Sequence, residues 1–172
     1  MEGCKRTMLE QLKELLEMQR ELDNAILKEH GNVYDRNIAE KNKISLLVEL
    51  GEMMNELPTY FKHWKFTAEN NREKALVEYV DALKFELSLF NYYKETVEYM
   101  NEYDNYDKLI KSTLKLSEVL LTCIICLSES EVKLSLEWLF NIGNYLGFTW
   151  EEIYNTYKKK NAVNYERLKN GY

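Results

Sequence analysis

The sequence predicts an all-α fold, a helical bundle of about six helices. Only one proline and six glycines occur among the 172 residues, so few positions interrupt a helix. Apolar residues recur at three- and four-residue spacing over long segments, the period of a helix face. No segment has the apolar–polar alternation of a half-buried strand. The length suits one domain over residues 1–172.

The first two helices are separated by a short glycine-containing loop. We expect the first helix over residues 5–28, where apolar side chains follow one face, and its end in the loop at 30–32. The second helix is expected over 38–57. It stops at Pro58, because proline lacks an N–H group and disfavours a helical residue before it.

The third and fourth helices are the next two periodic segments. We expect the third over 72–99, with Asn70 as its N-cap and Glu73 three residues further on. A polar loop at 101–105 separates it from the fourth helix, expected over 106–127.

The last two helices both begin at a predicted capping box, in which Ser or Thr precedes Glu by three residues. One box at Ser128 opens the fifth helix, which Gly147 ends. The other, at Thr149, opens the sixth helix over 150–168.

Charge and hydropathy exclude several classes of partner. The net charge is −6, whereas a nucleic-acid binder usually has a basic surplus, so we expect no nucleic-acid partner. The longest apolar run, near 119–127, is too short to cross a bilayer, so we expect no membrane partner.

The cysteines indicate packing and not chemistry. Three cysteines, an odd number, argue against a disulfide framework. Cys123 and Cys126 form a C-x-x-C inside an apolar run, without a second pair of zinc ligands. We expect both to be buried free thiols and the location to be the reducing cytoplasm.

Acidic residues are paired on two consecutive helices. Glu49, Glu52 and Glu56 share one face of the second helix inside an otherwise apolar run. Glu78 and Asp81 repeat the spacing on the third helix. Buried like charges repel and are costly without cations. Two antiparallel helices would present these hard oxygen ligands to Mg²⁺ or Mn²⁺, which can activate water for attack on a phosphoryl group.

Two other interpretations of the acidic residues stay open at this point. One acidic pair alone is most often a solvated helix face, and the chain has other such pairs. A di-iron bundle site also uses carboxylates, but it wants Glu-x-x-His motifs. Neither His30 nor His63 follows a glutamate at that spacing, which disfavours iron.

Five sequence blocks extend the acidic pattern over nearly the whole chain: residues 46–56, 61–65, 78–89, 147–153 and 157–172. Together they resemble the dimeric dUTPases, within the MazG-like all-α nucleoside triphosphate (NTP) pyrophosphatases. The resemblance implies that fold, a homodimer, and Mg²⁺-dependent hydrolysis of dUTP and dUDP to dUMP, with Mn²⁺ as a possible substitute.

The resemblance also assigns roles to the acidic residues. It implies that Glu49, Glu52, Glu78 and Asp81 are the metal ligands. It further implies that one glutamate of the first pair, Glu49 or Glu52, orients or deprotonates the attacking water.

Phosphate contacts are expected from basic and amide side chains. Lys160, Asn164 and Arg167 lie four and then three residues apart, hence on one face of the sixth helix. Such groups donate to phosphate oxygens, and in the family this segment closes over the phosphates. An ordinary charged terminal helix is the alternative. Lys62 and Lys65 are further phosphate-binding candidates.

The resemblance implies a base pocket that includes Gln19, Asp23, Trp64, Lys84 and Phe85. Trp64 and Phe85 resemble residues that line the uracil pocket, with core aromatics as the alternative. Asp23 stands where many relatives have asparagine, and Lys84 where many have histidine. These departures leave two other functions open, a pyrophosphatase for dCTP or a broader set of nucleotides, and a non-catalytic regulator.

Overall fold

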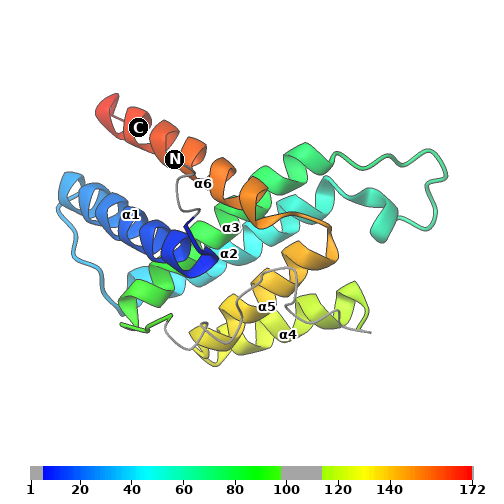
Figure 1. Ribbon diagram of the computed structural model, residues 1–172, viewed down its shortest axis with the longest axis horizontal. Coiled ribbons are helices and arrows are strands. Elements are labelled where there is room, and N and C mark those ends of the chain that lie inside the picture. The colour runs from blue at the N-terminus through cyan, green and yellow to red at the C-terminus, as the bar shows by residue number, and fades with distance from the viewer. Residues whose placement is uncertain (1–5, 98–113, 172) are drawn as a thin grey trace.

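The computed structural model describes residues 6–97 and 114–171 (Figure 1). In these two ranges the structure consists of α-helices joined by loops and one short 3₁₀ helix, without a strand, which confirms the all-α fold. The helices are α1 (Met8–Glu29), α2 (Arg36–Asn55), η1 (Pro58–Tyr60), α3 (Arg72–Tyr92), α4 (Leu116–Ser128), α5 (Val132–Tyr145) and α6 (Trp150–Lys169).

Helix α3 is the centre of the bundle. It runs beside α2, with α1 and α6 packed on one side and the α4–α5 pair on the other (Figure 1). Side chains such as Tyr79, Leu83 and Leu87 on α3 are fully buried. Burial on several faces explains the near-continuous apolar composition of this helix. None of the helices described is long and apolar enough to cross a membrane.

The predicted start of the sixth helix is confirmed by its capping interactions. The Thr149 side chain accepts a hydrogen bond from the backbone N–H of Glu152, and the reciprocal bond is present, which confirms that capping box. Gly147 has a φ of +73°, a left-handed conformation that glycine adopts at low cost, at the end of the preceding helix.

Two predicted caps are wrong. The N-cap of α3 is Asn71, whose side chain accepts from the N–H of Lys74, while Asn70 accepts from the N–H of Thr59 across the loop. Ser128 does not open α5. It is the last residue of α4, and its hydroxyl donates backwards to the carbonyl of Ile125. Helix α5 begins four residues later, at Val132.

Several predicted helix ends also differ. Helix α2 ends at Asn55 and not at 57. Helix α3 ends at Tyr92, well before the predicted 99, because Lys94 adopts a left-handed backbone with φ of 56° that a helix cannot continue. Helix α4 begins at Leu116, and the part of its prediction over 106–113 lies outside the described residues.

The joint between α3, α4 and α5 contains buried polar groups. Cys123 and Cys126 are buried free thiols, as predicted. Glu86 of α3 is completely buried and accepts a hydrogen bond from the Ser135 hydroxyl of α5. Its second oxygen has no hydrogen-bond partner among the described residues. Burial raises the pKa of Glu86 to about 8, so this carboxyl keeps its proton at neutral pH.

Candidate functional site

The paired helices α2 and α3 bring three predicted metal ligands together. One carboxylate oxygen from each of Glu49, Glu52 and Glu78 lies within 4.8 Å of the others. Three convergent carboxylates form the type of oxygen donor set that hard divalent cations prefer. The donor set therefore fits the metal that the sequence predicts.

Asp81, the fourth predicted ligand, lies beside this group of three, and its charge raises the pKa of both Glu49 and Glu78. Its carboxylate pairs with ammonium groups. One oxygen forms an ion pair with Lys160 of α6, and the other lies 3.7 Å from the Nζ atom of Lys84.

The electrostatics of the cluster favour a cation. Burial is the largest cause that raises the pKa of Glu49 to about 7, followed by the charges of Asp81 and Glu52. Burial and then the charge of Asp81 also raise the pKa of Glu78. Both shifts mean that the negative charges are unfavourable where they lie, and a bound divalent ion would relieve this repulsion.

The surroundings of the acidic face differ from the sequence prediction. We expected these carboxylates to be buried in an apolar run, but Glu52 is exposed. On the same helix Ile44 and Val48 are 62% and 50% exposed. Helix α2 buries only the face that includes Leu46 and Met53, so its other apolar side chains do not enclose the carboxylates.

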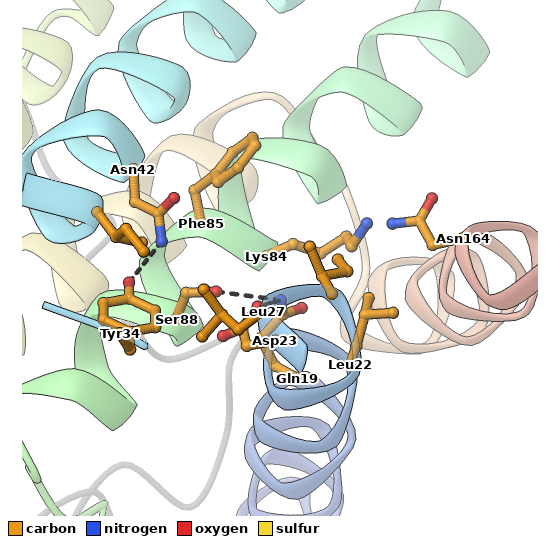
Figure 2. Close-up of a pocket in the computed structure, with 12 residues that line it drawn as sticks. Gln19, Leu22, Asp23, Leu27, Tyr34, Asn42, Lys84, Phe85, Ser88 and Asn164 are labelled. Atoms are coloured by element: carbon orange, nitrogen blue, oxygen red, sulfur yellow. Dashed lines mark hydrogen bonds between the residues drawn. The ribbon is translucent and has the colours of Figure 1, made fainter. Parts of the chain in front are cut away.

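A cavity of about 240 Å³ opens further along the same helices (Figure 2). Residues from four helices line it, among them Gln19, Asp23, Asn42, Lys84, Phe85, Ser88 and Asn164. Four of the five predicted base-binding residues are in this wall. Lys84 lines the cavity three residues after Asp81 on α3, so the cavity begins about 5 Å from the acidic cluster along the helix axis.

Gln19 has each of its polar groups engaged inside the protein. The Tyr157 hydroxyl donates to its Oε1 atom at 2.6 Å, while its Nε2 atom donates to Asp23 at 2.7 Å and to the Ser88 hydroxyl at 3.1 Å. Gln19 therefore orients Asp23. Burial raises the pKa of Asp23 to about 6, whereas its hydrogen bonds with Ser88 and Gln19 lower it.

The face of helix α6 that is predicted to bind phosphate lies beside both the acidic cluster and the cavity. Lys160 reaches Asp81, and one turn later Asn164 lines the cavity. Figure 2 shows the side chains of Lys84 and Asn164 pointing toward each other. Arg167 borders a second hollow of about 420 Å³ that shares Asn164 with the first.

Three predicted contacts lie apart from these cavities, in the segment after η1. Trp64 is 63% exposed and contacts the His63 ring edge-to-face, so it is not a core aromatic and does not line the cavity. The Nζ atom of Lys62 lies 5.2 Å from the centre of the Phe61 ring, and Lys65 is exposed. In Figure 1 the connection from α2 to α3 extends away from the bundle.

Two polar residues of the cavity wall, Asn42 and Ser88, were not predicted from the sequence as binding residues. Ser88 had a detectable signal, because it lies one turn after Lys84 on the same face of α3. Asn42 had none, since its place depends on how α2 packs against α3.

Fold and site together define a class of protein, an all-α bundle that carries a carboxylate cluster and an adjoining cavity between its helices. A family model described as dUTPase matches residues 11–172. The chain belongs to this all-α dimeric dUTPase family, which confirms the resemblance, and its activity is that of a dUTP diphosphatase. The comparison with curated proteins found no match.

Proposed function

We propose that this dUTP diphosphatase depends on Mg²⁺, for which Mn²⁺ can substitute, and that it hydrolyses dUDP as well as dUTP to dUMP. The convergence of three carboxylate oxygens within 4.8 Å of one another supports the metal requirement. The proposed ligands are Glu49, Glu52, Glu78 and Asp81. When bound, divalent ions supply positive charge for the phosphate oxygens and lower the pKa of water.

The chain's own side chains supply proton transfer and phosphate binding in this proposal. Glu49 or Glu52 orients the attacking water and accepts its proton. Lys160, Asn164 and Arg167 donate to the phosphate oxygens from one face of α6. Lys62, which is half-buried, and the exposed Lys65 stay candidates for the same role.

The base occupies the cavity between α1 and α3 in this proposal. Asp23, oriented by Gln19, accepts a hydrogen bond from the imide N–H of uracil. Phe85 offers an aromatic face, and the buried Lys84 donates to a carbonyl oxygen. The Asp23 carboxylate would also accept from the amino group of cytosine, so dCTP is the competitor that tests base selection most stringently. Trp64 stays a candidate base contact outside this cavity.

A substrate panel tests both the metal and the base. With Mg²⁺, the purified protein is expected to release pyrophosphate from dUTP at least about tenfold faster than from dCTP, dTTP or UTP. Cytosine would leave polar groups of the cavity unpaired, whereas dTTP differs from dUTP by a methyl group and UTP by a 2′-hydroxyl, so these two test the fit around the base and the sugar. Phosphate release from dUDP tests the second substrate. Chelation by EDTA should abolish both reactions and Mn²⁺ should restore them. Turnover that resists chelation would contradict the metal requirement, and equal rates with dCTP would contradict the pocket assignment.

We also propose that a second copy of the chain covers the exposed apolar face of α2 and α4. The family is dimeric, and these two contacting helices expose Ile44, Val48, Leu121 and Ile125 by 62%, 50%, 59% and 55%. Apolar groups in such numbers mark interaction surfaces.

Sedimentation equilibrium tests this interface directly. It should give about twice the 20.6 kDa mass of one chain, since each copy buries the apolar face of the other. Val48→Asp should shift the mass toward one chain, while Val33→Asp, at a loop position that is 82% exposed, should leave it unchanged. A wild-type mass of one chain would exclude the dimer.

A further inference from the structure

The four acidic residues of the proposed metal site do not all have the same neighbours. Glu49, Glu52 and Glu78 converge on one another. Asp81 is instead held by the ammonium group of Lys160, with that of Lys84 at 3.7 Å on its other oxygen. The side chains of Asp81 and Lys160 are only 15% and 24% exposed. An ion pair shielded in this way is screened less by water and salt than one on an open surface.

Lys160 also neutralises Glu49 and Glu78 in part. Its charge lowers the pKa of both Glu49 and Glu78, against the effects of burial and of their acidic neighbours. A lysine ammonium group and a divalent cation compete for the same carboxylate, so Asp81 can serve a metal fully only when Lys160 moves aside. The four-carbon stem of lysine is flexible enough for such a movement.

Phosphate groups provide an alternative partner for Lys160. Asn164 and Arg167, which share its face of α6, lie by the cavities where the proposed nucleotide binds. A nucleotide in this position would offer Lys160 phosphate oxygens in exchange for the Asp81 carboxylate. Metal and nucleotide would then promote each other's binding, because thermodynamic coupling is reciprocal.

We propose that Lys160 is an internal counter-ion that occupies Asp81 until a nucleotide's phosphates draw it away. A first divalent ion then binds Glu49, Glu52 and Glu78 without nucleotide, and a second ion uses Asp81 only together with nucleotide. This inference rests on the proposed metal site and adds the number of ions and the order in which they bind.

The test is to titrate Mn²⁺ into nucleotide-free protein and to measure bound ions by electron paramagnetic resonance. Wild type should bind one ion per chain in the tight range. Lys160→Met removes the charge at similar length and should make a second ion bind, or raise its affinity by about tenfold. Lys160→Arg keeps the charge and should behave as wild type. Lys159→Met, at the exposed neighbouring position, is the matched control.

A second arm adds a non-hydrolysable α,β-imido analogue of dUTP to the wild type, with the analogue alone measured in parallel. Bound Mn²⁺ should rise from one to two per chain. Identical titrations of wild type and Lys160→Met, with circular dichroism showing both folded, would overturn the counter-ion. Two equally tight ions in nucleotide-free wild type would also contradict the counter-ion role of Lys160, while they would still agree with the proposed metal site. Absence of Mn²⁺ binding to every form would instead refute the metal site itself.

Discussion

Replacing Glu49 by glutamine is expected to slow dUTP hydrolysis by about a thousandfold or more, because it removes a proposed metal ligand and a proposed general base together. Glutamine preserves the shape but lacks the charge and the basicity. The folded state should not suffer, since burial and acidic neighbours raise the pKa of Glu49 to about 7 and make its charge unfavourable there. Asp81→Asn, which removes another proposed ligand, should also abolish turnover.

The measurement is kcat at saturating Mg²⁺ and dUTP, with circular dichroism to show that the helices persist. Glu56→Gln is the matched control, because Glu56, the C-cap residue of α2, lies one turn after Glu52 but outside the group of three converging carboxylates. It should lose far less activity. A Glu49→Gln enzyme with the wild-type rate would remove Glu49 from the catalytic site.

The second large effect concerns stability and comes from Glu86. Its pKa is about 8 in the folded protein against 4.5 for a free glutamate, because it is buried. Its contribution to stability is complete below pH 4.5 and is lost as the pH rises toward 8, since the unfolded chain releases this proton first. The loss is on the order of 1 kcal/mol per pH unit from this one group.

Glu86→Gln should remove that pH dependence. At roughly 2–4 °C in Tm per kcal/mol for a chain of this size, the wild type should lose about 6–12 °C more than the variant between pH 5 and 8. Thermal unfolding followed by circular dichroism measures both curves. Glu69→Gln, at an exposed loop position, should retain the wild-type pH dependence. Parallel curves for wild type and Glu86→Gln would show that Glu86 is ionised in the fold.

The sequence predicted most of the helices, because periodicity and the scarcity of glycine and proline are local properties. It located the box at Thr149, where the cap and the helix that it opens are adjacent in the chain. It failed at Ser128 and Asn70, where the same residue types bond to a different segment. A capping pattern identifies residues able to cap, whereas the neighbouring helix end or loop decides which group they bond.

For the site, the sequence by itself determined which carboxylates share a helix face. The spacing of Glu49 to Glu52 and of Glu78 to Asp81 fixes that in any helix. Only the tertiary structure decided that three of them converge while Lys160 of α6 pairs with Asp81. It also decided that Gln19 is engaged with Tyr157 and that Trp64 is exposed and does not line the cavity. These outcomes depend on which helices pack together, and contacts between residues far apart in the chain leave no periodic signal in a single sequence.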